Sequence, residues 1–314
     1  MQGGRNVSRR TLLHLLLGGL CAPLGMAAAP IFNVSSLLRD FSRSGFRCRR
    51  YRVDATVLVC GVPLFTKPNV GGAFASIETG SIAGSSAAAL QFAAGSWPDR
   101  AHGLNRFGIW REVIWEHPAA SREIVFAGLM TDSREHTLAE GRSALSGNSL
   151  GEALVCFGTV SGDRCRTSTF RAPIRPDLNW LELPRVLDEV TRQEATSNPS
   201  ETTLPEAPIP TFLYAIRAAL LQKQADFHQQ FVHAGKLYHL DARRSVERPA
   251  TISAAIRNPS GGRCADFRIS SAVGEDNEIP VRIEYRAQPF LRLTLELAPG
   301  ANQQRIQSSF EENF

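Results

Sequence analysis

Two neighbouring segments near residue 290 alternate strictly between apolar and polar residues, and this pattern restricts the fold more than any other. Residues 281–286 place Val, Ile and Tyr on one face and Arg, Glu and Arg on the other. Residues 291–297 alternate four leucines with Arg, Thr and Glu. A period of two residues is that of a β-strand with one buried face. Because the connection through Ala287-Gln288-Pro289 is short, the two strands are expected to be antiparallel neighbours.

Similar segments recur along the chain. Strands are predicted at 51–59, 73–78, 109–117, 123–129, 153–160, 166–172, 229–233, 236–242, 250–256 and 264–273, with a turn at 68–72 and a loop at 80–89. Helices are predicted over 133–145, 181–192 and 211–223. The last of these has apolar residues spaced by three and four, so it is expected to cover the apolar face of the final strands. The predicted fold is mainly β (α+β), with curved antiparallel meander sheets and a few packed helices.

Residues 1–29 have the pattern of a twin-arginine signal peptide. Ser8-Arg9-Arg10-Thr11-Leu12-Leu13 is followed by an apolar run to Met26 and by three alanines at 27–29. The run is short and is interrupted by Gly and Pro, which argues against a membrane anchor, and no later stretch is apolar enough to cross a bilayer. We therefore predict export of the mature chain to the periplasm or the medium.

The remainder divides by composition. We expect a β-rich region over 30–192, a linker or long exposed loop over 193–210, a helix plus antiparallel meander over 211–300, and a flexible tail over 301–314. Segment 193–210 is rich in Glu, Ser, Thr and Pro without an apolar period. Whether it separates two domains or is a loop within one is left open.

Charge bears on whether the chain binds nucleic acid, and the cysteines bear on whether it contains disulfides. The formal charge of +5 comes from scattered arginines and only three lysines, so no nucleic-acid partner is predicted. Five cysteines follow residue 29, an odd number that leaves at least one unpaired. Cys156 and Cys165 flank a turn at 160–163 and are predicted to form a disulfide across a hairpin.

The densest polar segment is 95–108, and it is the candidate ligand-binding loop. Its candidate residues are Ser96, Arg100, His102, Asn105 and Arg106. An anion or polar head group is one interpretation. The alternative is a structural loop whose side chains bond to their own backbone.

Three histidines, His228, His233 and His239, fall in one predicted hairpin and are interpreted as surface residues. No metal site and no cofactor is predicted, since no third ligand is evident beside them. The chain contains no G-x-S-x-G, H-E-x-x-H, P-loop or EF-hand motif.

Segments 90–108 and 126–130 resemble exported bacterial proteins of unknown function, and Ile279-Pro280-Val281-Arg282-Ile283-Glu284 is similar to the last strands of a related periplasmic domain family. The resemblance implies a periplasmic, mostly β protein and transfers no catalytic residue. The favoured hypothesis is a non-catalytic cell-envelope module that binds a lipid or another hydrophobic ligand on a concave sheet face. The alternative is a hydrolase-type enzyme that uses the 95–108 loop.

Overall fold

A computed structural model describes residues 41–101, 106–116, 122–131, 152–175, 178–193, 199–205, 210–272, 278–288 and 290–298. The described residues form fourteen strands: β1 (Phe41–Val59), β2 (Val62–Ile82), β3 (Ser85–Ser96), β4 (Phe107–Glu116), β5 (Arg122–Thr131), β6 (Glu152–Ser161), β7 (Arg164–Pro173), β8 (Ser200–Thr203), β9 (Asp226–His233), β10 (Lys236–Arg244), β11 (Thr251–Arg257), β12 (Arg263–Ser270), β13 (Arg282–Gln288) and β14 (Leu291–Leu297). The described helices are the 3₁₀ turn η2 (Trp180–Glu182), α4 (Leu183–Gln193) and α5 (Phe212–Leu221).

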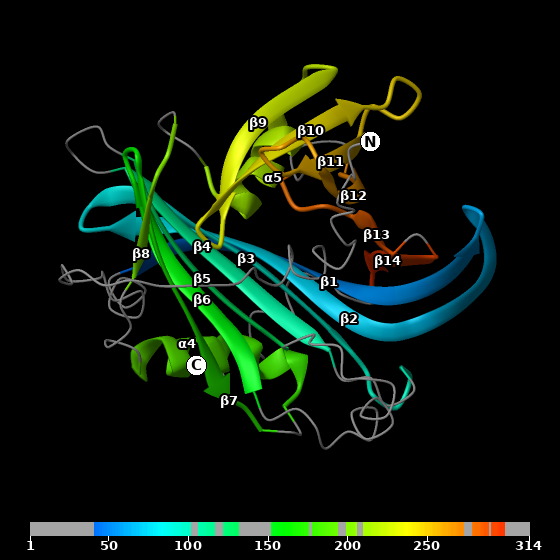
Figure 1. Cartoon of the computed structure of the whole chain (residues 1–314), viewed down its shortest axis with the longest axis horizontal. Coiled ribbons are helices and arrows are strands. Elements are labelled where there is room, and N and C mark those ends of the chain that lie inside the picture. Colours follow the sequence, from blue (N-terminus) through cyan, green and yellow to red (C-terminus); the bar gives the residue numbers. More distant parts are fainter. Residues whose placement is uncertain are drawn as a thin grey trace, which may run out of the picture.

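All fourteen strands belong to one antiparallel sheet, whose order is β8-β7-β6-β5-β4-β3-β2-β1-β14-β13-β12-β11-β10-β9 (Figure 1). Each strand pairs with its sequence neighbours, with two exceptions: β8 and β9 form the two edges of the sheet and do not pair with each other. The first described strand also pairs with the last, with Tyr51 opposite Leu297 and Val57 opposite Leu291. This pairing joins two meanders into one strongly curved surface. The mainly β fold with an antiparallel meander and few helices is therefore confirmed.

Within the described residues the curved sheet is not closed into a ring. No strand ladder joins β8 to β9. The two edges approach where the turn between β9 and β10 reaches β8, and the Thr202 hydroxyl donates to the carbonyl of Gly235 at 3.4 Å. The curved sheet thus partly encloses a space on its concave side.

Two local predictions were wrong because the sheet accommodates residues that usually break strands. The predicted turn at 68–72 lies inside β2, where a bulge places the Asn69 amide 2.7 Å from the Asp54 carboxylate and gives Asn69 a φ of 53°. The predicted loop at 80–89 is mostly strand, because the turn is confined to Ala83-Gly84 between β2 and β3. Segment 193–210 contains β8, which pairs with β7.

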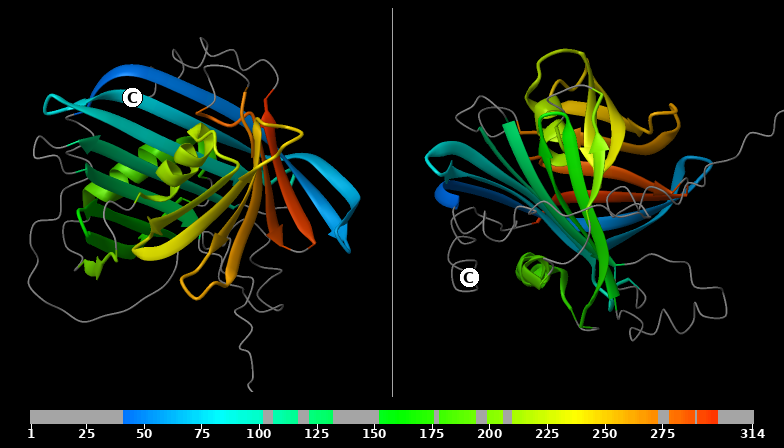
Figure 2. Two further views of the ribbon diagram at one scale, coloured as in Figure 1. Left: turned by 90° about the horizontal axis from the view of Figure 1, so that it is seen from above. Right: turned by 60° about the vertical axis from the view of Figure 1, so that its left-hand side comes forward.

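The outer, convex face of strands β2–β7 is covered by η2 and α4 (Figures 1 and 2). The Arg111 guanidinium on β4 lies 2.6 Å from the Asp188 carboxylate on α4. Trp180 packs closely against the sheet because Gly72 and Gly95 lack a Cβ atom. Such an atom would lie 2.3 Å from the Trp180 ring at Gly72 and 2.5 Å from the Trp180 Cβ atom at Gly95. Helix α5 lies on the opposite side of the sheet, inside the curve.

Several predictions fall outside the described residues: the signal peptide at 1–29, the helix at 133–145 and the tail at 301–314. The division of the chain into regions at 193–210 also stays a prediction. No helix among the described residues is long and apolar enough to span a bilayer.

Candidate ligand-binding cavity

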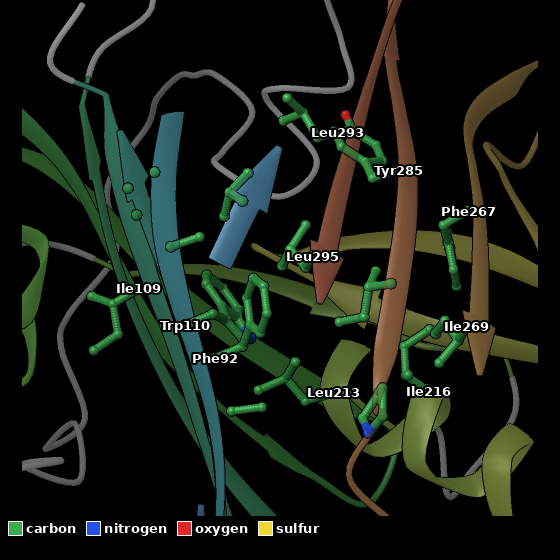
Figure 3. A pocket seen from close by; sticks show the side chains of 18 of the residues that line it. Phe92, Ile109, Trp110, Leu213, Ile216, Phe267, Ile269, Tyr285, Leu293 and Leu295 are labelled. Atoms are coloured by element: carbon green, nitrogen blue, oxygen red, sulfur yellow. The ribbon is translucent and has the colours of Figure 1, made fainter. Parts of the chain in front are cut away.

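A cavity of about 660 Å³ lies between the concave face of the sheet and α5. Its walls come from both meanders: Phe92 and Trp110 on β3 and β4 face Phe267 and Ile269 on β12, and Leu295 of β14 lies between them (Figure 3). Leu213 and Ile216 of α5 close a further side. A volume of this size with predominantly apolar walls is that of a small-molecule site.

The cavity exists because α5 fills only part of the concave space. Four residues of α5 (Phe212, Ala215, Ala219 and Leu220) are buried against strands β9–β13. The predicted helix at 211–223 thus covers the apolar face of the last strands, as expected. Leu213 and Ile216 are only partly buried against the same cluster and also line the cavity. One side of α5 therefore packs against strands β9–β13, and another side forms a wall of the cavity.

The N-terminus of α5 is held by a buried carboxylate from a distant strand. Glu112 of β4 has no exposed surface. Its oxygens accept from the backbone amides of Leu213 and Tyr214, both at 2.9 Å, from the Thr211 hydroxyl at 2.6 Å and from the Trp110 indole at 2.8 Å. Burial raises the pKa of Glu112, and the donated hydrogen bonds act in the opposite direction. A negative charge also complements the positive end of the helix dipole.

His233 completes the packing around this anchor. Its ring is buried, with its centroid 4.2 Å from that of Trp110 and 5.6 Å from that of Phe212. Burial lowers the pKa of His233 to about 3, so the imidazole is neutral in the folded protein. The interpretation of His233 as a surface residue was therefore wrong. His228 is exposed and bonds to the Asp241 carboxylate at 2.9 Å.

An ionic cluster closes the cavity beside α5. Glu278 accepts from Arg217 on α5 at 2.7 Å and also pairs with Arg47 on β1. The next residues are fixed to the same strand, because Arg49 donates to the carbonyl of Ile279 and the Tyr51 hydroxyl donates to that of Pro280 at 2.6 Å. Segment 278–280 is thereby tied across the inner face of β1.

The polar loop at 95–108 lies at the edge of this cavity, and its described residues divide into two groups. Ser96 and Arg106 line the cavity, and the Ser96 hydroxyl accepts from the Arg106 amide at 2.8 Å. Arg100 is exposed and lies 3.7 Å from the Asp99 carboxylate. His102 and Asn105 fall outside the described residues. The Ser96 hydroxyl thus has a structural partner, and the hydrolase alternative stays a hypothesis.

The predicted disulfide between Cys156 and Cys165 is not formed, and both residues are free, buried thiols. The hairpin register places Thr169 opposite Cys156 and Val160 opposite Cys165. The two cysteines are therefore offset by four residues along the ladder, which at about 3.4 Å per residue exceeds the reach of a disulfide. Burial raises the pKa of Cys156 to about 12.

Sequence reasoning missed most of the cavity. The leucines of β14 were visible from their alternation, but Phe92, Trp110 and Glu112 were not singled out. Trp110 and Glu112 are two residues apart on one strand and therefore share its inner face, which was the available signal. Among the described residues, no group of three or more His, Cys, Asp or Glu is placed to hold a metal ion.

Comparisons with known proteins leave the function open. No family model matches the chain, and no curated protein shows a significant match. Among solved structures, the chain is similar to a β-barrel-like protein of the domain of unknown function DUF1849 from Brucella abortus, with 9% identity, a TM-score of 0.39, and coverage of 80% of this chain and 96% of that chain.

Proposed function

We propose that the protein binds an elongated hydrophobic ligand, such as a lipid acyl chain, in the cavity between the curved sheet and α5. The observation that carries this proposal is the cavity of about 660 Å³ with predominantly apolar walls. If α5 served only as part of the core, larger side chains filling this space would stabilise the fold, because an empty cavity lowers the free energy of unfolding.

The cavity also has a route to the surface. Val57 and Phe65 line it and are 37% and 58% exposed, so its wall continues to the outside at the end of the β1–β2 hairpin. Lys67 lines the cavity from the same hairpin, and Arg106 lines it beside Ser96. This arrangement supports a ligand whose apolar chain lies inside and whose polar end remains near solvent.

The cellular setting of this proposal is the cell envelope, reached by twin-arginine export. The support is the sequence of residues 1–29, with its paired arginines, apolar run and alanines. The ligand would then be a lipid or another hydrophobic molecule of the envelope, and the protein a binding module rather than a catalyst.

The proposal is tested by titrating the purified protein with the fluorescent fatty acid cis-parinaric acid and displacing it with saturated fatty acids of increasing length. Burial of each methylene contributes about 0.8 kcal/mol. Each two-carbon extension should therefore tighten binding about tenfold until the cavity is full.

Ile216→Trp is expected to weaken binding by occupying the cavity, and Val246→Trp is the matched control, because Val246 is 94% exposed. Circular dichroism checks that both variants are folded. Saturable binding that Ile216→Trp leaves unchanged, or a lack of any binding by the unaltered protein, would contradict the proposal.

A further inference from the structure

The end of the β1–β2 hairpin carries a concentration of exposed apolar side chains. We call it the hairpin tip and define it by Val57, Val59, Val62, Leu64 and Phe65, together with Phe290, whose carbonyl accepts from the Leu58 amide at 2.8 Å. Leu64 is 73% exposed and Val62 is 65% exposed. Half of the large apolar side chains exposed in the described part of the chain lie within 57–65. Side chains gathered in this way mark an interaction surface rather than ordinary exposure.

The tip projects because β2 extends beyond the end of the neighbouring strand β3. The ladder between β3 and β2 runs only from Gly71 to Ile82, and the Trp97 amide donates to the carbonyl of Val70, so residues 62–69 of β2 extend beyond the end of β3. Figures 1 and 2 show the hairpin extending past the adjoining strands. The turn at its end is tight, with Cys60 and Gly61 both at positive φ. A protruding, apolar end of a two-stranded hairpin can insert into an apolar environment without disturbing the rest of the sheet.

Charge and edge chemistry decide between two occupants. The segments that form and flank the tip, 55–67 and 285–295, contain Lys67, Arg286 and Arg292 and no acidic residue. Basic residues around an apolar patch suit an anionic lipid surface. Pairing of the free edge with a second copy is opposed by Pro63, which has no amide hydrogen to donate, and by Lys67.

The geometry points to the hairpin tip as a docking surface for an anionic lipid bilayer. The inference deepens the proposed function and depends on it for one step, the entry of ligand: Val57 and Phe65 belong both to the tip and to the cavity wall, so a docked tip would place the cavity against the bilayer. The docking itself depends only on the exposed side chains and the charge of the tip.

The test uses sedimentation of the full chain with vesicles of phosphatidylcholine and phosphatidylglycerol at a ratio of seven to three, and with phosphatidylcholine alone. Binding is expected to the anionic vesicles and to weaken as salt is raised. The double variant Val62→Ser/Leu64→Ser should bind at least tenfold more weakly, because two apolar side chains no longer enter the bilayer. Val246→Ser is the matched control, since Val246 is exposed but lies away from the tip.

A second measurement locates the tip directly. A fluorophore sensitive to polarity, attached to the exposed Cys60 in a chain with Cys21→Ser and Cys264→Ser, should shift to the blue on adding anionic vesicles. A lack of vesicle binding, equal binding by the double variant, or no spectral shift at Cys60 would overturn the inference. So would a dimer in light scattering that the double variant abolishes without any vesicle binding, because the tip would then be an interface between copies.

Failure of the inference and failure of the proposed function give different results. Neither Val62 nor Leu64 lines the cavity, so the double variant should bind cis-parinaric acid in solution as the unaltered protein does. Vesicle binding without any binding of cis-parinaric acid would contradict the cavity's proposed role and leave the docking surface intact. The reverse result would contradict docking and leave the cavity's role intact.

Discussion

Replacement of Glu112 by Gln tests whether a single buried carboxylate positions α5 against the sheet. Each carboxylate oxygen accepts two hydrogen bonds: one oxygen from Trp110 and Leu213, the other from Thr211 and Tyr214. In Gln, an amide NH₂ group replaces one oxygen, so two of the four donors lose their charged acceptor. An N–H group among them would face another donor, whereas the Thr211 hydroxyl could turn to accept. A hydrogen bond to a charged group contributes about 1.5–3 kcal/mol, and two such losses amount to about 3–6 kcal/mol.

Part of this cost is offset. The Gln side chain carries no charge, so the variant avoids the desolvation penalty that raises the pKa of Glu112 in the folded protein. We therefore expect the free energy of unfolding to fall by about 2–4 kcal/mol. The measurement is urea denaturation followed by circular dichroism and by tryptophan fluorescence, to which Trp110 and three other tryptophans contribute.

The matched control is Glu189→Gln on α4. Glu189 is half exposed and pairs with Arg185 at 3.4 Å, and a surface ion pair of this kind contributes at most about 1 kcal/mol. If Glu112→Gln changes the free energy of unfolding by no more than the control does, Glu112 is not the anchor of α5 and the argument for its role is refuted.

Three further predictions follow from buried groups. His233 has a pKa of about 3 in the folded protein and 6.5 in the unfolded chain. Because only the unfolded chain gains a proton between these values, the free energy of unfolding falls as the pH is lowered from 6.5 toward 3. The loss at pH 5 is about 2 kcal/mol. His233→Phe should flatten the pH dependence of urea denaturation in that window, and an unchanged slope would contradict its burial as a neutral group. The Tyr285 hydroxyl is buried without a hydrogen-bond partner among the described residues, so Tyr285→Phe should leave the free energy of unfolding unchanged or raise it by about 1 kcal/mol; a loss of more than about 1 kcal/mol in thermal denaturation would show a partner that we have missed. Cys60 is exposed, whereas Cys156 and Cys165 are buried with raised pKa values, so a thiol reagent at pH 8 should modify Cys60 rapidly and the other two only in urea; rapid modification of Cys156 in the native protein would contradict its placement.

The local pattern predicted those elements whose formation depends on nearby residues. Alternation located β13 and β14, and spacings of three and four located α5, because each element buries one face. Segment 68–72 was misassigned because Pro, Asn and Gly favour turns in isolation, and segment 80–89 because its small residues suggested a flexible loop. In the folded chain, pairing with β1 and β3 carries β2 through Asn69 and up to Ile82.

The candidate site was less predictable, because its contacts join residues far apart in sequence. Three of the four donors to Glu112 lie about a hundred residues away, and no local pattern records such a contact. His233 was interpreted as a surface residue because histidines are most often found there, although Phe231 and Val232 precede it. Its burial depends on contacts with Trp110 and Phe212, which are distant in sequence. The cysteine pair failed on register, since a four-residue offset in a hairpin cannot be read from the turn alone.

The ladder between β1 and β14 has a consequence for when the protein can work. The wall that contains Val53 and Leu295 is made from the first and the last described strands, paired across more than two hundred residues. A ribosome must release the chain through β14 before this seam can close, and contacts of such long range form slowly. The cavity proposed to hold a ligand is therefore absent from a nascent chain, and any loading would follow the completion of folding.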